Sequence, residues 1–206
     1  MTITNYATLQ SAIADFLDRE DLAATVPTFI RLAEARIDRE LRHWRQVARS
    51  AVTIATQYNA IVPADFVQPI RLQILSGPTG EVAPISNSAM LQLRGERNDR
   101  VGTPTNYALT AGQIEVFPTP DDTYDASLVY YGRVPALSNV NTTNWLLTEA
   151  PDLYLYGSLL HSAPYLKDDQ RAVIWEGLFA TGLANLTLSS EAATYGGSGL
   201  RMKTKR

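Results

Sequence analysis

The pattern of apolar residues between positions 144 and 188 predicts two consecutive helices. Five side chains recur at spacings of three and four and therefore share one face of the first helix: Leu153, Tyr156, Leu159, Leu160 and Ala163. Leu155 lies on another face, so this helix is apolar nearly all round and must be covered on more than one side. Pro151 suits its first turn, and Pro164 ends it within a residue or two.

The second helix of this pair carries a stripe of small side chains: Val173, Gly177, Ala180 and Ala184. We expect Asp168 or Asp169 to cap its start. A glycine inside a helix costs about 0.5–1 kcal/mol relative to alanine, so Gly177 and Gly182 predict that another backbone comes close. The pair is either an ordinary buried hairpin or a hairpin that also packs against a neighbouring subunit through Gly177, Ala180 and Ala184.

Two further amphipathic helices are predicted near the N-terminus. The first spans residues 4–20 with Thr4 or Asn5 as its cap, and the second runs from Thr25, its cap, to Trp44 with Pro27 in its first turn. The polar sides of the second helix carry a row of arginines: Arg31, Arg36, Arg39 and Arg42. This row is either a solvated face with same-helix ion pairs or a charged seam against another subunit.

Between the two helix pairs the pattern changes to strands and turns. We predict strands at residues 47–56, 69–75, 81–85, 107–110, 113–117 and 126–134. A short helix follows the third strand, starts at Ser86 or Asn87 and closes at Gly95. Ala111-Gly112 forms the tight turn of a hairpin, whereas residues 58–66 are irregular because Pro63 interrupts them.

The order of these elements indicates an α+β protein. Residues 1–45 and 144–188 supply helix pairs that can meet as one helical bundle, and residues 46–143 form a β-rich insertion. Residues 189–206 are too polar and glycine-rich to fold alone and form a flexible basic arm. The end of this arm either docks on a larger partner or is a frayed terminus, and the docking residues are Leu200, Arg201, Met202, Lys203, Lys205 and Arg206.

Composition and charge narrow the class of protein. The 206 residues contain 45% hydrophobic and 19% charged residues, no cysteine and no apolar run long enough to cross a membrane. The net charge is −3, with +3 on residues 31–49 and +4 on residues 201–206, so the rest of the chain carries −10. An acidic body with three lysines is a poor candidate for a DNA binder that follows phosphates. Because the N-terminus lacks the features of a signal peptide, we expect a soluble protein made in a cytosol.

The residue types that support catalysis are scarce. His43 and His161 lie on different helices outside any metal-binding spacing, so each is expected at a helix surface or boundary. The acidic group Asp121, Asp122 and Asp125 is typical of a turn and lacks the glycine of a calcium loop. Glu149 and Asp152 are interpreted as charges at a helix start. We therefore predict no enzyme, no metal, no cofactor and no catalytic residue.

Several segments in this order resemble the adaptor, or head-to-tail connector, proteins of short-tailed bacteriophages. They are FIRLAEARIDRELR (29–42), Tyr58 with VPADF (62–66), IEVFPTPD (114–121), SLVYYGRVPALS (127–138) and TNWLLTEAPDLYLYGSLLHSAPYL (143–166), followed by the helix with Trp175. No single motif is chemically diagnostic. The resemblance covers about residues 5–188, and no motif matches the C-terminal tail.

The resemblance implies a structural virion protein at the head–tail junction. In the proteins that this chain resembles, twelve copies form a ring between the portal and a tail or nozzle protein, and DNA passes through the ring without sequence-specific binding. It thus implies a dodecamer made in the host cytoplasm, with the portal, the tail, DNA and other copies as partners. Ring contacts join two different faces of a subunit, so opposite charges on those faces would set their register.

Two other functions are alternatives to a structural virion protein. A cell-wall hydrolase would use carboxylates such as Glu149 and Asp152 and would lose its turnover when either is replaced. A nucleic-acid-binding module would use the arginine-rich helix, and the isolated protein would then bind DNA in a salt-dependent way.

Overall fold

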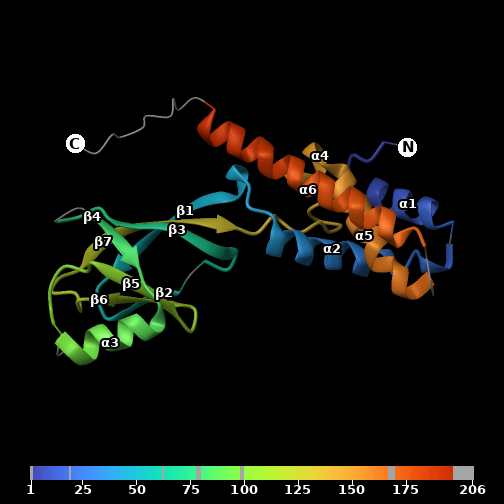
Figure 1. Cartoon of the computed structure of the whole chain (residues 1–206). Coiled ribbons are helices and arrows are strands. Elements are labelled where there is room, and N and C mark those ends of the chain that lie inside the picture. The colour runs from blue at the N-terminus through green and yellow to red at the C-terminus, as the bar shows by residue number, and fades with distance from the viewer. Residues whose placement is uncertain are drawn as a thin grey trace, which may run out of the picture. The chain divides into compact units, whose positions relative to one another are not determined.

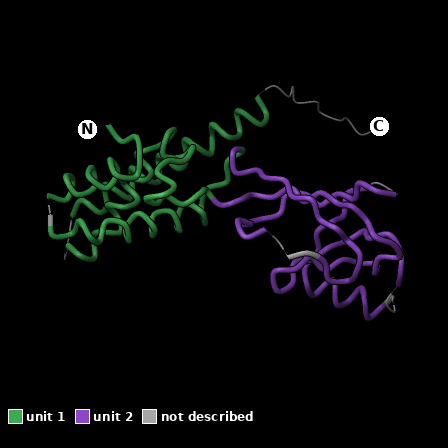
Figure 2. Tube along the Cα trace, turned by 180° about the vertical axis from the view of Figure 1, so that it is seen from behind, with its two compact units in different colours: residues 1–44, 134–206 green, residues 45–133 purple. Residues whose placement is uncertain are grey.

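The structure is a computed structural model, and it describes residues 2–18, 20–61, 63–77, 80–97, 100–166 and 170–196. The described residues form six α-helices and seven strands (Figure 1), so the α+β class predicted from the sequence is confirmed. Close contacts divide the chain into two units (Figure 2): unit 1 comprises residues 1–44 and 134–206, and unit 2 comprises residues 45–133. Proximity alone does not test independent folding, so the predicted domain boundaries stay a prediction.

Unit 1 contains the four helices that the apolar spacing predicted and one short helix that it did not predict. They are α1 (Tyr6–Leu17), α2 (Val26–Glu40), α4 (Trp145–Glu149), α5 (Pro151–Leu166) and α6 (Ala172–Tyr195), with a 3-10 turn at Glu20–Leu22 and another at Trp44–Gln46. Helix α5 contacts α1, α2, α4 and α6. Leu153, Tyr154 and Leu159 of α5 are fully buried in one core with Phe29 of α2 and Phe179 of α6. The prediction that α5 is covered on more than one side is therefore confirmed.

The helix termini of unit 1 agree only in part with the sequence predictions. Asn5 caps α1 by accepting from the backbone N–H of Thr8 at 2.9 Å, as its position predicted. Thr25 makes no side-chain cap for α2, although Pro27 does occupy its first turn. The short helix α4, which Asn144 caps, was missed because five residues carry too little periodicity to be recognised.

Helix α6 is longer than its sequence suggested. It continues to Tyr195, seven residues beyond the predicted end at Leu188, so residues 189–195 are helical rather than part of an arm. Ser190 is buried there, and its Oγ accepts from the backbone N–H of Trp44 at 2.9 Å. The predicted caps Asp168 and Asp169 lie outside the described residues, as do the six docking residues of the arm.

Unit 2 is a curled sheet of seven strands with one helix. The strands follow the order β1-β7-β3-β4-β5-β6-β2, with all neighbours antiparallel except β4 and β5. Their bounds are β1 (Val47–Ile54), β2 (Tyr58–Ile61), β3 (Phe66–Ile74), β4 (Gly80–Pro84), β5 (Asn106–Thr110), β6 (Gln113–Phe117) and β7 (Tyr124–Gly132), and helix α3 spans Asn87–Arg97. Ile54, Leu72, Ile114 and Leu128 fill the core, because alternate residues of each strand face inward.

Three local predictions for unit 2 were wrong. Residues 58–61 form the edge strand β2, β3 begins at Phe66 and continues through Pro69, and α3 passes through Gly95. The predicted turn is confirmed, since Ala111 and Gly112 have φ angles of 50° and 76° between β5 and β6.

Candidate functional site

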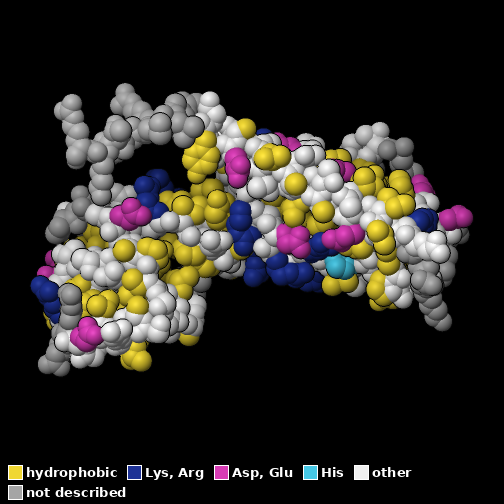
Figure 3. Space-filling model, in the orientation of Figure 1, with side chains coloured by type: hydrophobic (Ala, Val, Ile, Leu, Met, Phe, Trp, Pro, Cys, Tyr) yellow, Lys and Arg dark blue, Asp and Glu magenta, His cyan; other side chains and the backbone are white. Residues whose placement is uncertain are grey.

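Helix α6 presents an apolar face that no described part of the chain covers. Val173, Ile174, Leu178 and Leu188 are 80%, 62%, 41% and 62% exposed. The small or uncharged residues between them are exposed as well: Gly177, Ala180, Thr181, Ala184 and Asn185. In Figure 3 yellow and white side chains predominate over this helix. A helix that is apolar nearly all round is normally buried, so this face is suited to contact with another molecule.

The opposite face of α6 packs inside unit 1. Trp175 and Phe179 are buried there, and a Cβ built on Gly182 would lie 3.1 Å from Leu153 Cδ2 of α5. The same test at Gly177 finds no atom within 4 Å. The close approach inferred for Gly177 is therefore not made with any residue that the structure describes, and Gly177, Ala180 and Ala184 lie on the outward face.

A tight helix crossing that was not predicted from the sequence lies at Gly157 of α5. A Cβ at this position would lie 3.0 Å from Phe179 Cε2 and 3.1 Å from Ala33 Cβ. Gly157 occurs among large apolar residues of α5, and this was the available signal for a crossing with α2 and α6.

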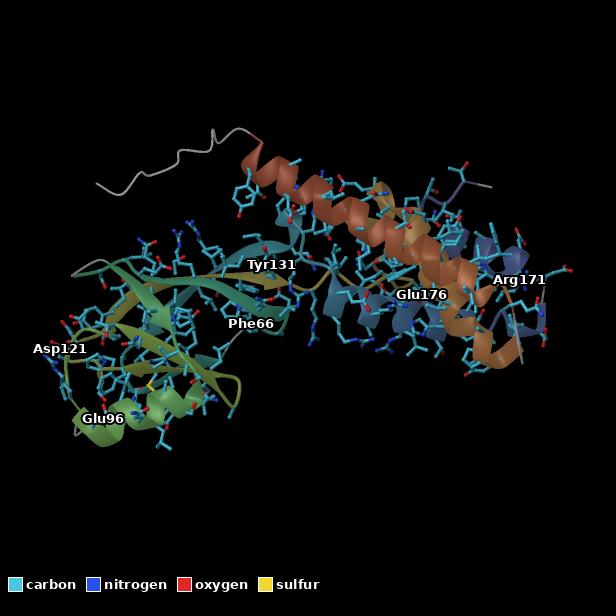
Figure 4. All side chains as sticks on the ribbon, in the orientation of Figure 1. Phe66, Glu96, Asp121, Tyr131, Arg171 and Glu176 are labelled. Carbon is cyan, nitrogen blue, oxygen red and sulfur yellow. The ribbon has the colours of Figure 1, made fainter. Side chains whose placement is uncertain are left out.

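Arg36 of the arginine row pairs within the chain. Its Nη1 and Nη2 each donate to one carboxylate oxygen of Glu176 at 2.7 Å, and its Nε donates to Glu40 at 2.9 Å (Glu176 is labelled in Figure 4). The guanidinium also lies 4.5 Å from the centre of the Phe179 ring. The hydrogen bonds from Arg36 hold the pKa of Glu176 below its ordinary value, against the opposing effect of burial.

The other three arginines of the row fall into two groups. Arg42 donates from Nη1 to the backbone carbonyls of Asp38 and Leu41 at the end of α2. Arg31 and Arg39 are exposed and have no hydrogen bond or ion pair to any residue that the structure describes. Of the four predicted interface arginines, Arg31 and Arg39 thus keep their charge available for another molecule.

Comparison with known protein families adds the decisive observation. The model of the SU10 adaptor protein family matches residues 4–202, which is nearly the whole chain. The chain belongs to the SU10 adaptor protein family. The resemblance noted from the sequence motifs is therefore confirmed, although none of the curated proteins compared with the chain matches it.

Family membership sets the broad function of this adaptor. It implies a structural bacteriophage protein, located in the virion at the head–tail junction and associated with portal and tail proteins. Among the described residues, no helix is both long and apolar enough to cross a membrane. The family also implies a structural rather than an enzymatic role.

Of the two histidines of the adaptor, His43 is more buried than predicted, whereas His161 lies at a boundary position as expected. His43 is 3% exposed and stacks on Trp145 with ring centres 5.0 Å apart, so its expected place at the surface was wrong. His161 is half-buried, and its Nε2 has no hydrogen-bond partner among the described residues. Burial and the nearby cations Arg36 and Arg39 lower the pKa of His161.

The carboxylates considered for catalysis occupy ordinary structural positions. Glu149 is the last residue of α4, and Asp152 lies in the first turn of α5. Asp121 accepts from the Tyr124 hydroxyl at 2.6 Å, and Asp122 accepts from the backbone N–H of Thr123 at 2.7 Å. No group of three or more metal-binding side chains occurs in the parts of the chain that the structure describes.

Proposed function

We propose that this protein is a ring-forming head-to-tail adaptor that links the portal to the tail and surrounds the DNA exit channel. The observation that carries the proposal is the exposed apolar face of α6 in a chain of the adaptor family. A ring of twelve copies, as in the proteins whose motifs it resembles, gives that face a covering surface on every subunit. DNA passes through the lumen without sequence-specific binding, since Arg36 and Arg42, two of the four arginines of the row, are engaged within the chain.

The contact between subunits is heterologous, as closed rings require. The face of α6 with Gly177, Ala180 and Ala184 packs against a different surface of the next copy. Arg31 and Arg39 form the charged part of the seam and meet acidic side chains there. Because they are exposed in the single chain, they set the register more than they add to affinity.

The C-terminal residues are proposed to contact the portal. Residues 200–206 combine Leu200 and Met202 with four cations, a composition suited to docking on an acidic surface. Deletion of residues 196–206 should leave the melting temperature of the adaptor nearly unchanged and weaken its binding to purified portal, most noticeably at low salt. Unimpaired binding of the truncated chain would remove the docking role of this segment.

Charge insertion into the α6 face tests the proposed ring. Leu178→Asp and Leu188→Asp place a carboxylate on the exposed face and should leave the folded monomer intact, because neither side chain is in the core. Both variants should fail to form rings in native mass spectrometry and should not attach to DNA-filled heads that lack the adaptor. Val140→Asp is the matched control, since Val140 is 97% exposed on a loop outside α6. Normal ring formation by both α6 variants would contradict the proposal.

A further inference from the structure

Two arginines of unit 2 lie on the outer face of the sheet, on either side of one residue. Arg49 of β1 and Arg71 of β3 both pair with Val129 of β7. Leu128 and Tyr130, the neighbours of Val129, face the core, so Val129 and the two arginines share the opposite face. Two inter-strand spacings place the arginine Cα atoms about 10 Å apart.

Both side chains have their hydrogen-bonding capacity available. Arg49 and Arg71 are exposed, and neither has a hydrogen bond or ion pair to any other residue in the described ranges. Ser127 is the next residue of β7 on the same face, where it pairs with Ala51 and Gln73. It is 7% exposed, and its Oγ has no hydrogen-bond partner among the described residues. The guanidinium groups of Arg49 and Arg71, beside the Ser127 hydroxyl, therefore form a site suited to a pair of oxyanions.

The remaining charges on this face favour side-chain carboxylates over a nucleic acid. Glu81 pairs with Gln73 and Asp125 pairs with Thr53, so both carboxylates stand on the same outer face. A DNA duplex carries one charge per about 1.7 Å and would pass close to these acidic groups, whereas two cations neutralise only two phosphates. An isolated pair of carboxylates on a protein loop, by contrast, matches the charge of the two arginines.

The chain itself carries such a loop. Asp121 and Asp122 are exposed just before β7, and each uses one carboxylate oxygen in a local hydrogen bond. Four residues of strand, about 14 Å, separate Asp125 from Val129, and the loop lies beyond Asp125. Figure 4 shows Asp121 and Tyr131 toward opposite ends of unit 2. The loop and the arginine pair are thus two different surfaces of the same unit.

We infer that the Asp121–Asp122 loop of one copy binds the face formed by Arg49, Arg71 and Ser127 of the next copy. This inference rests on the proposed ring, because a contact between two different surfaces generates a closed ring or a filament. It adds a polar contact between unit 2 domains to the apolar contact proposed for α6. Charge complementarity of this kind selects one orientation of neighbouring subunits.

A charge swap tests the pairing. Arg49→Glu with Arg71→Glu should raise the concentration needed for ring assembly by about tenfold or more, and Asp121→Lys with Asp122→Lys should do the same. The chain with all four substitutions should recover assembly, measured by native mass spectrometry. Arg100→Glu is the matched control, since Arg100 is an exposed arginine of the same unit. Normal assembly of both double variants, or no recovery in the fourfold variant with an unchanged melting temperature, would overturn the inference.

Cross-linking provides a second test that leaves every charge in place. The chain has no cysteine, so Ala51→Cys beside Arg49 and Thr123→Cys beside Asp122 would introduce its only thiols. In assembled particles, a short bismaleimide should link the double variant into a ladder of dimers and larger species, whereas each single variant should stay monomeric on a denaturing gel. Rings that form but do not cross-link would overturn the inference and leave the proposed function standing. DNA binding is a separate readout of the same face. If the wild type retains DNA in a salt-dependent way and the variant with Arg49→Glu and Arg71→Glu does not, the face binds phosphate instead.

Discussion

Arg36 of α2 and Glu176 of α6 form a two-pronged ion pair across 140 residues of sequence. Both N···O distances are 2.7 Å, and the Arg36 side chain is 19% exposed, against 46% for Glu176. Arg36 also bonds to Glu40 and lies over the ring of Phe179. The pair therefore ties the N-terminal and C-terminal helices of unit 1 together at the edge of their shared core.

Replacing Arg36 should destabilise unit 1. Arg36→Ala removes two charge-assisted hydrogen bonds and the ring contact, so we expect the free energy of unfolding to fall by about 1–3 kcal/mol. Arg36→Lys should lose part of this stabilisation, because a lysine ammonium cannot donate two parallel hydrogen bonds to the Glu176 carboxylate. All three tryptophans lie in unit 1, so urea unfolding followed by tryptophan fluorescence reports on it. Arg31→Ala, on the exposed side of α2, should change stability by less than about 0.5 kcal/mol, and equal effects would contradict the assignment.

The ion pair should weaken in acid. Because Arg36 lowers the pKa of Glu176 below its ordinary value of 4.5, the stabilisation is complete above pH 4.5 and is lost as the pH falls through the folded-state pKa. The difference in unfolding free energy between the wild type and Glu176→Gln should therefore shrink between pH 6 and pH 3.5. Burial raises the pKa of Glu34, so the ionisation of Glu34 changes stability with pH in the opposite direction. Both the wild type and Glu176→Gln contain Glu34, so the difference between them reports on Glu176. A difference that is constant over this range would refute the prediction.

The same substitution should have opposite effects at two glycines of unit 1. Gly177→Ala adds a methyl group in open space and should stabilise α6 by about 0.5–1 kcal/mol. Gly157→Ala places Cβ 3.0 Å from Phe179 and 3.1 Å from Ala33, and we expect a loss of about 1–3 kcal/mol. Urea unfolding of the two variants checks the sign, and a stabilised Gly157→Ala would show that the crossing is looser than described.

A larger side chain at Gly177 separates folding from assembly. Gly177→Leu should leave the unfolding midpoint of the monomer close to that of Gly177→Ala, because both side chains point away from the core. If a neighbouring subunit packs on this face, only the leucine variant should lose ring formation and attachment to the portal. Native mass spectrometry of both variants decides, and normal assembly of Gly177→Leu would refute close packing there.

In unit 2, Glu115 should be among the most sensitive positions. Arg94 Nε donates to Glu115 Oε1 at 2.9 Å, and the two side chains are 11% and 9% exposed. Glu115→Ala removes the carboxylate that pairs with the largely buried Arg94 guanidinium, and we expect the free energy of unfolding to fall by about 3–5 kcal/mol. Far-UV circular dichroism during urea unfolding measures the loss, and Glu96→Ala on the exposed side of α3 is the control. Similar midpoints for the two variants would show that the pair contributes little.

The local spacing of apolar, capping and turn residues determined most of the helices and strands in this protein. Helices α1, α2 and α5 and the β5–β6 hairpin follow from period-3.6 apolar stripes, cap residues and Ala111-Gly112, all of which act within a few residues of each other. Strand β2 and the continuation of β3 through Pro69 were missed, because pairing with β6 and β7 outweighs a poor local preference.

The sequence by itself also determined that α5 is apolar nearly all round, that α6 carries a stripe of small side chains, and that Arg31, Arg36, Arg39 and Arg42 form a row. Only the tertiary structure decided which side of α6 is covered, because Gly157 lets Phe179 approach α5 and turns Gly177, Ala180 and Ala184 outward. It also decided that Arg36 is bound by Glu176, whereas Arg31 and Arg39 stay exposed. Partners 140 residues apart leave no periodic signal in the chain, since their contact depends on how the helices cross and not on local spacing.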